Sequence, residues 1–184
     1  MKLNARFPLF LALACGVAAT PACAMLKPDD PAPLFDVKAA LAGKDFDFSL
    51  AEALRNGPVV VYFYPKSFTS VCTEEAHEFA EASESFAAAG ASLIGLSGDE
   101  IETQREFSSK ECRDKFPVGA DADLSIAKTY DATMSLPAVG ALFASRISYV
   151  VAPDGKILSA VADSDAHPHI QAALEAVRKW RERR

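Results

Sequence analysis

The feature that most restricts the fold of this chain is an uninterrupted run of β-branched and aromatic residues at 58–64, Pro-Val-Val-Val-Tyr-Phe-Tyr. A run without polar alternation is typical of a strand that is buried on both faces. Residues 70–89 follow with apolar residues on one face and Gly90 at the end, which predicts a helix. We therefore expect a strand, a turn and a helix at the centre of an α/β domain.

The segments around this unit continue the alternation of strands and helices. Upstream, a short half-buried strand is predicted at 45–48, and Ser49 with Glu52 forms a capping box that begins a short helix. The elements predicted downstream are a buried strand at 91–96, a helix from the cap Asp99 to about 113, a strand at 117–120, a helix at 121–130, a loop at 132–144, a hairpin of strands at 147–151 and 157–162, and a helix from about 165. This order implies a parallel core extended by an antiparallel edge, which fits a thioredoxin-like α/β fold with a mixed central sheet flanked by helices.

The first 24 residues have the composition of a signal peptide. Lys2 and Arg6 precede 13 apolar or small residues, and Ala22-Cys23-Ala24 supplies the small side chains that a signal peptidase accepts. We expect cleavage after Ala24 and a periplasmic or otherwise exported location. Thirteen residues are fewer than the roughly 20 that a membrane-spanning helix needs, so no stable membrane anchor is expected. An alternative is a lipoprotein signal acylated on Cys15 or Cys23.

Cleavage at this position leaves residues 25–184 as one domain. The 184 residues less these 24 leave 160, which is enough to bury a hydrophobic core without disulfides or metal ions. The first 24 residues contain two of the 19 cationic residues and none of the 25 acidic ones. Residues 25–184 therefore have 17 cationic and 25 acidic residues and a net charge of −8. Because phosphate binding relies mainly on Lys and Arg, we expect no nucleic-acid partner.

Two of the four cysteines remain after cleavage, Cys72 and Cys112. In an oxidising compartment such a pair could be a structural disulfide or a redox couple. Cys72 falls in the first turn of the predicted helix, where unpaired backbone N–H groups and the helix dipole favour negative charge. Because the thiolate is the nucleophilic form of cysteine, this position favours a reactive Cys72.

A local motif surrounds Cys72. Pro65 and Thr69 stand seven and three residues before it, in the string Pro-Lys-Ser-Phe-Thr-Ser-Val-Cys. This string resembles the Pro-x-x-x-Thr/Ser-x-x-Cys signature of peroxiredoxins. The segments Asp-Ala-Asp at 121–123 and Arg-Ile-Ser-Tyr-Val-Val-Ala-Pro-Asp-Gly at 146–155 also resemble family segments. Among subgroups the chain is most similar to the bacterioferritin-comigratory-protein group, also called PrxQ.

The resemblance implies a thiol peroxidase that reduces hydrogen peroxide and organic hydroperoxides. It makes Cys72 the peroxidatic cysteine, Thr69 the hydroxyl that hydrogen-bonds the peroxide, and Pro65 the shield that limits water access to the sulfur. Arg146 is implied as the guanidinium that stabilises the thiolate and the charge developing on the peroxide. Glu75 resembles the acidic residue that orients this arginine.

In this chemistry the sulfenic acid formed on the peroxidatic cysteine condenses with a second thiol. Many PrxQ proteins carry that thiol five residues after the first, but His77 occupies the position here. Another subtype carries it on the next helix, where it aligns with Ser108, and Cys112 lies one turn further on the same face. We therefore expect Cys112 to form an intramolecular disulfide with Cys72 after local unfolding. A buried, unreactive Cys112 is the alternative.

Three other functions compete with this interpretation. A thioredoxin-like disulfide oxidoreductase would have a Cys-x-x-Cys pair, but Thr69 stands at the first position. A copper-handling protein would need two close thiols and a suitably placed histidine. An inactive thioredoxin-like binding module, held by a disulfide between Cys72 and Cys112, would be favoured by the loss of Thr69 or Arg146, and both are present.

The remaining expectations concern partners and histidines. We expect a peroxide substrate, a thioredoxin-like or low-molecular-weight thiol reductant, and a monomer. No cofactor is expected. His77 is predicted to lie on an exposed helical face without a role. His167 and His169 could suggest a metal site, but we interpret them as solvated residues that cap the last helix.

Overall fold

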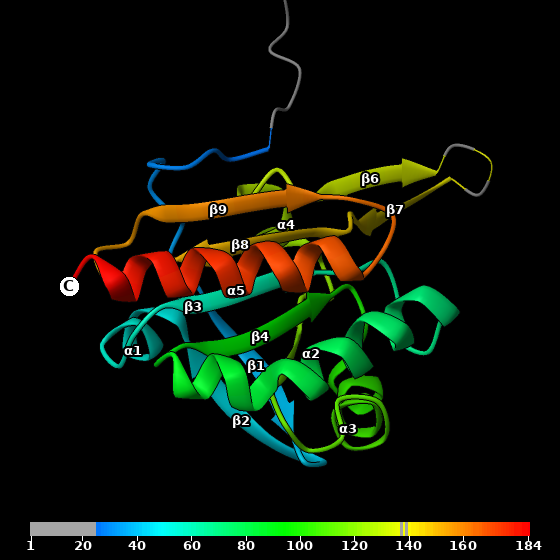
Figure 1. The fold of residues 1–184 in the computed structure, drawn as a ribbon. Helices are drawn as coiled ribbons and strands as arrows, with labels where there is room; N and C mark the ends of the chain where they lie inside the picture. Colours follow the sequence, from blue (N-terminus) through cyan, green and yellow to red (C-terminus); the bar gives the residue numbers. More distant parts are fainter. Residues whose placement is uncertain (1–24, 137, 139) are drawn as a thin grey trace, which may run out of the picture.

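A computed structural model describes residues 25–136, 138 and 140–184, so the predicted signal peptide lies outside the described residues. The strands are β1 (Asp36–Leu41), β2 (Lys44–Ser49), β3 (Val59–Phe63), β4 (Ser92–Ser97), β5 (Val118–Ala120), β6 (Thr133–Leu136), β7 (Ala141–Ala144), β8 (Ile147–Val151) and β9 (Ile157–Ala162). The helices are α1 (Leu50–Leu54), α2 (Ser70–Ala88), α3 (Ile101–Lys110), α4 (Ser125–Thr129) and α5 (His167–Glu182). Figure 1 shows their arrangement.

A seven-stranded mixed sheet forms the centre of the domain, in the order β2-β1-β5-β4-β3-β8-β9. Strands β3, β4 and β5 are parallel, and the outer strands pair antiparallel on both sides. Helices α2, α3 and α5 contribute to the hydrophobic cluster on one face, and α1 and α4 to the cluster on the other. The predicted mixed sheet flanked by helices is therefore confirmed. None of the described helices is long and apolar enough to cross a membrane.

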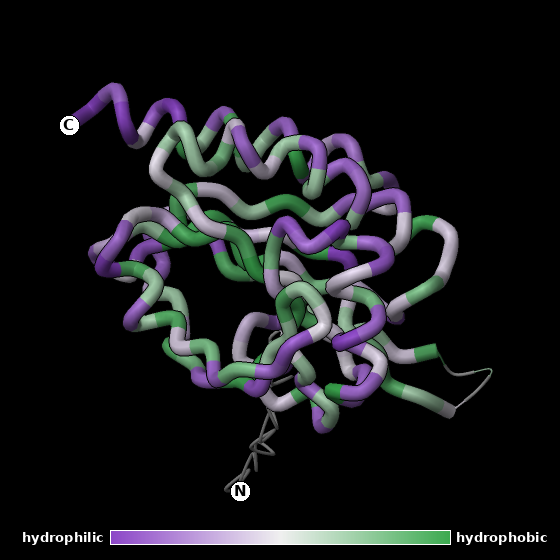
Figure 2. Tube along the Cα trace, turned by 90° about the horizontal axis from the view of Figure 1, so that it is seen from below, coloured by the Kyte–Doolittle hydropathy of each residue, from purple (hydrophilic) through white to green (hydrophobic). Residues whose placement is uncertain are grey.

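Strand β3 is buried on both faces of the sheet. All five of its residues are buried, and their side chains alternate between the two clusters. Val61 and Phe63 point into one cluster, and Val60 and Tyr62 into the other, as the two-residue period of a strand requires. Figure 2 shows hydrophobic residues along the central strands and hydrophilic residues at the C-terminal end of α5.

Two predictions about the periphery of the sheet need correction. The expected loop over 132–144 contains the hairpin of β6 and β7, which forms a separate two-stranded sheet. Its residues are half-buried or exposed except Ala144, which is buried at the end of β7. The sheet also has a second antiparallel edge, because β1 and β2 form a hairpin and β1 pairs antiparallel with β5. Ala42 and Gly43 make this turn with φ of 50° and 73°, without the Asn-Gly or Asp-Gly signal typical of such turns.

Only one of the two predicted cap positions is correct. Ser49 precedes α1, but its side chain makes no capping hydrogen bond. Helix α3 begins at Ile101 after Glu100, so Asp99 lies outside the cap position. The Asp99 carboxylate instead contacts the loop that precedes Cys72, which gives it a place at the candidate site.

Candidate active site

Cys72 is the third residue of α2 and is 2% exposed. The loop between β3 and α2 carries Pro65 and Thr69, and Thr69 stands at the cap position of the helix. The Thr69 hydroxyl donates a hydrogen bond to the carbonyl of Lys66 at 2.9 Å and does not cap α2. The sulfur therefore lies at the end of the helix where backbone N–H groups lack helical acceptors and the dipole favours negative charge.

Strand pairing brings Arg146 to this position although 74 residues separate it from Cys72. Phe63 at the end of β3 pairs with Ile147 at the start of β8, so Arg146 lies beside the loop that leads to α2. Its Nη2 donates to the Cys72 Sγ at 3.2 Å. Its Nη1 donates to Oε2 of Glu75, which lies about one helical turn after Cys72 on α2. Two branches of one guanidinium thus contact the sulfur and the carboxylate.

Burial dominates the electrostatics of this group. Glu75 is fully buried, and burial raises its pKa to about 7 although Arg146 acts in the opposite direction. Burial also works to lower the pKa of Arg146, but the neighbouring Glu75 and Cys72 raise it above its ordinary value overall. The guanidinium therefore stays charged beside the sulfur at any relevant pH.

The other predicted residues around the sulfur lie in the loop. Pro65 is half-buried and Thr69 is exposed. Pro65 lines a hollow of about 100 Å3 together with Leu142 and Phe143 of β7. The hairpin that sequence analysis predicted as a loop thus borders the approach to Pro65.

A buried hydrogen-bond network, which no sequence pattern predicted, holds this loop. The Ser67 N–H donates to Oδ2 of Asp99 at 2.7 Å, and the Tyr64 hydroxyl donates to Oε1 of Gln104 at 2.8 Å. Partial burial works to raise the pKa of Asp99, but hydrogen bonds from the Ser67 N–H, Lys66 and Ser97 hold it below its usual value. Phe68, the residue after Ser67, has a left-handed backbone with φ of 64°, which residues with a side chain rarely adopt. Only the meeting of β3, β4 and α3 creates the network, so no local signal could have found it.

Cys112 lies two residues beyond the end of α3 and is fully buried. Its N–H donates to the carbonyl of Phe107 at 3.0 Å. Both cysteines are free and belong to one hydrophobic cluster, which also contains Tyr62. Burial, and to a lesser extent Glu111, raises the pKa of the Cys112 thiol well above its ordinary value. In the folded state Cys112 is therefore a protonated thiol shielded from water.

Two predictions about histidines are wrong. His77 is half-buried, and its Nε2 lies 2.7 Å from Oε2 of Glu111. His169 is fully buried, with Nδ1 2.8 Å from the Ser148 hydroxyl, and burial lowers its pKa. His167 is exposed, as predicted. Among the residues that the structure describes, no group of three His, Cys, Asp or Glu side chains could hold a metal ion.

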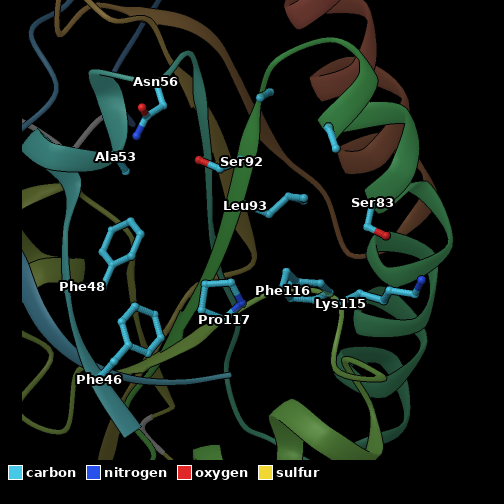
Figure 3. Close-up of a pocket in the computed structure, with 12 residues that line it drawn as sticks. Phe46, Phe48, Ala53, Asn56, Ser83, Ser92, Leu93, Lys115, Phe116 and Pro117 are labelled. Atoms are coloured by element: carbon cyan, nitrogen blue, oxygen red, sulfur yellow. The ribbon is translucent and has the colours of Figure 1, made fainter. Parts of the chain in front are cut away.

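A larger groove, of about 410 Å3, lies away from these residues. Figure 3 shows it between the side chains of Phe46 and Phe48 on one side and Ser83 of α2 on the other. It borders the second half of α2, whereas Cys72 lies at the beginning of this helix. None of the predicted site residues lines it.

A cysteine at the start of a helix after a central strand, with a guanidinium on its sulfur, defines a thiol-based site on an α/β sheet. Residues 28–160 match the AhpC/TSA family model, and the chain belongs to the AhpC/TSA family. Peroxiredoxin Bcp of Xanthomonas campestris pv. campestris is 29% identical over 150 residues, which cover 80% of this chain and 92% of that protein.

Solved structures agree with this family. The crystal structure of peroxidoxin BcpB from Mycobacterium tuberculosis has a TM-score of 0.75 at 28% identity and covers 84% of this chain and 97% of its own. A structure of the bacterioferritin comigratory protein of Xanthomonas campestris, described for its alkyl peroxide reduction activity, has a TM-score of 0.69 at 26% identity and covers 79% and 92%. The predicted thioredoxin-like fold and the resemblance to PrxQ peroxiredoxins are confirmed, and the chain is a thiol peroxidase.

Proposed function

We propose that this peroxidase uses two cysteines, Cys72 to reduce hydrogen peroxide and organic hydroperoxides and Cys112 to resolve the product. The observation that carries the proposal is the contact of Arg146 Nη2 with the Cys72 Sγ at 3.2 Å, while Glu75 holds the other branch of the guanidinium. A fixed cation at this distance stabilises the thiolate and the charge that develops on a peroxide oxygen.

In the first step the Cys72 thiolate attacks one oxygen of the peroxide. An S–O bond forms, the O–O bond breaks, and the leaving oxygen takes up a proton and departs as water or an alcohol. The sulfur is oxidised by two electrons to the sulfenic acid. The Thr69 hydroxyl is proposed to hydrogen-bond the peroxide, and Pro65 to limit water at the sulfur. Thr69 is exposed and stands at the cap position of α2, three residues before Cys72, and its oxygen can accept a hydrogen bond from a peroxide while the hydroxyl donates to the Lys66 carbonyl, which supports its assignment.

In the second step the Cys112 thiol attacks the Cys72 sulfenic acid. An S–S bond forms and water leaves. Because both sulfurs are buried and burial raises the pKa of Cys112, this step requires local opening of the segment around Cys112 and the first turn of α2. A thioredoxin-like protein or a low-molecular-weight thiol then supplies two electrons and two protons, which restores both thiols.

The proposal includes an exported enzyme, supported by the composition of residues 1–24, and a monomer, supported by the similarity to PrxQ peroxiredoxins. The test is expression of the full chain in a bacterium, followed by cell fractionation and intact-mass measurement. Cleavage after Ala24 and recovery from the periplasm are expected. An acylated mass would indicate the lipoprotein alternative on Cys15 or Cys23, and a full-length cytoplasmic protein would contradict export.

The catalytic proposal is tested by stopped-flow oxidation of the reduced residues 25–184 with hydrogen peroxide, followed by intact-mass measurement. Wild type is expected to consume peroxide rapidly and to become about 2 Da lighter, through loss of two hydrogen atoms. Cys72→Ser should react slowly and keep its mass. Cys112→Ser should react as fast as wild type but accumulate oxidised Cys72 without an intramolecular disulfide. A Cys72→Ser variant as fast as wild type would contradict the assignment of the first step to Cys72.

A further inference from the structure

The segment that carries Cys112 is attached to α2 by a row of contacts between charged or ionisable side chains. Three pairs form this row, which we call the ion-pair ladder: His77 with Glu111 at 2.7 Å, Glu81 with Arg113 at 3.2 Å, and Glu84 with Lys115 at 3.4 Å. The members on α2 are spaced by four and three residues, so they lie on one stripe of the helix. Figure 3 shows Lys115 reaching α2 beside Ser83.

The partners on the other side are alternate residues of a short irregular segment at 111–115, between α3 and β5. Cys112 lies between the first two of them and is fully buried. Arg113 and Asp114 have φ of 52° and 59°, a left-handed backbone that is costly for residues with a side chain. The ladder therefore holds a strained segment in the conformation that buries Cys112.

We propose that the ion-pair ladder controls the resolving step, because it must open before Cys112 can reach the Cys72 sulfenic acid. This inference rests on the proposed role of Cys112. The ladder residues are positioning residues, since they act through Cys112 and do not contact the peroxide site. Weakening the ladder favours the open conformation and speeds formation of the disulfide. The first step, which takes place in the folded conformation around Arg146, keeps its rate.

The solvent exposure of the pairs determines the size of the effect. The side chains of Glu81 and Arg113 are 68% and 46% exposed, and those of Glu84 and Lys115 are 87% and 47% exposed. Pairs of this exposure change an equilibrium by about 1.5- to fivefold each, and salt screens them. The contact of His77 with Glu111 is less exposed, at 34% and 21%, and is an ion pair only when His77 is protonated.

The experiment neutralises one exposed pair with Glu81→Gln and Arg113→Gln in residues 25–184. Stopped-flow oxidation by hydrogen peroxide then separates the loss of the Cys72 thiol from the later loss of the Cys112 thiol. We expect the first rate to match wild type and the second to rise about 1.5- to fivefold. Raising NaCl to about 1 M should speed the second step in wild type and have less effect in the variant.

Two control variants separate this effect from a general loss of stability. The exchange of charges in Glu81→Arg with Arg113→Glu rebuilds the pair in reverse and should restore the wild-type rate. Neutralising Glu175 and Lys179, a pair within α5 that does not contact the Cys112 segment, should leave both rates unchanged.

The outcomes distinguish the ladder from the proposed function. If Cys112→Ser loses no turnover, then the role of Cys112 is wrong. If Cys112 resolves but the neutralised variant forms its disulfide at the wild-type rate, then the ladder does not control the step. An acceleration that the reversed pair fails to remove, or that the α5 control also produces, would likewise overturn the inference.

Discussion

Replacing Glu75 with glutamine removes one charge from the site while almost preserving its shape. The carboxylate is fully buried, and its Oε1 has no hydrogen-bond partner among the described residues. Its other oxygen accepts from Arg146 Nη1, and a glutamine amide oxygen can accept the same bond. Burial raises the pKa of Glu75 to about 7 from an ordinary value of 4.5. The variant therefore tests how much ionisation of the Glu75 carboxylate lowers the free energy of unfolding.

The sign and size follow from these two pKa values. Because the folded pKa lies above the unfolded one, the folded state holds more protons between them. The stabilisation by Glu75 is fully present below pH 4.5 and is lost as the pH rises through 7. The difference of about 2.5 between the two pKa values corresponds to about 3 kcal/mol. The introduced glutamine does not titrate. The free energy of unfolding of Glu75→Gln, relative to that of wild type, should therefore rise by about 3 kcal/mol between pH 4 and pH 8.

Urea unfolding of both reduced proteins at intervals from pH 4 to pH 8 measures this gain. Taking the difference between the proteins cancels the titration of shared groups such as His169, which burial also perturbs. A difference that stays flat, or that favours wild type as the pH rises, would refute the reasoning. The same variant should consume peroxide about five- to tenfold more slowly at pH 8, because Arg146 loses its ion pair with the Glu75 carboxylate.

Three further variants test the packing and the loop. Gly95→Ala would place a methyl group 2.6 Å from the Tyr62 ring, so we expect a loss of about 1–3 kcal/mol in urea unfolding, and an unchanged midpoint would contradict the packing. Phe79→Ala removes a fully buried ring stacked on Tyr62 at 4.4 Å between centroids and should cost about 3–5 kcal/mol by the same assay. Asp99→Asn weakens the hydrogen bond from the Ser67 N–H, so stopped flow should show oxidation of Cys72 about threefold or more slower and disulfide formation unchanged. A Cys72 oxidation rate equal to that of wild type would contradict a role of Asp99 in the site.

The sequence predicted best the elements whose signals are local. Strand β3 and helix α2 lie within one residue of the predicted ranges at both ends, because a continuous apolar run and a one-sided helical pattern are both unambiguous. The strands β8 and β9 match the prediction to the residue, since Pro153-Asp154-Gly155 marks the turn between them. The hairpin of β6 and β7 was missed because only Ala144 among its residues is buried, so its sequence carries no clear alternation of apolar and polar residues.

The candidate site divides in the same way. Cys72, Thr69 and Pro65 stand within eight residues, so a motif could identify them, and Arg146 and Glu75 followed from the family resemblance. The sequence alone could not show that Arg146 Nη2 lies on the sulfur, because the pairing of β8 with β3 decides it.

The sequence by itself thus determined most strands and helices of the thioredoxin-like order and the position of Cys72 at the start of a helix, since both depend on short-range patterns. Only the tertiary structure decided the loop network of Asp99 and Gln104 and the burial of Cys112 beneath the ion-pair ladder. These depend on contacts between residues more than 25 positions apart, whose geometry is set by packing of the helices on the sheet and not by any local propensity.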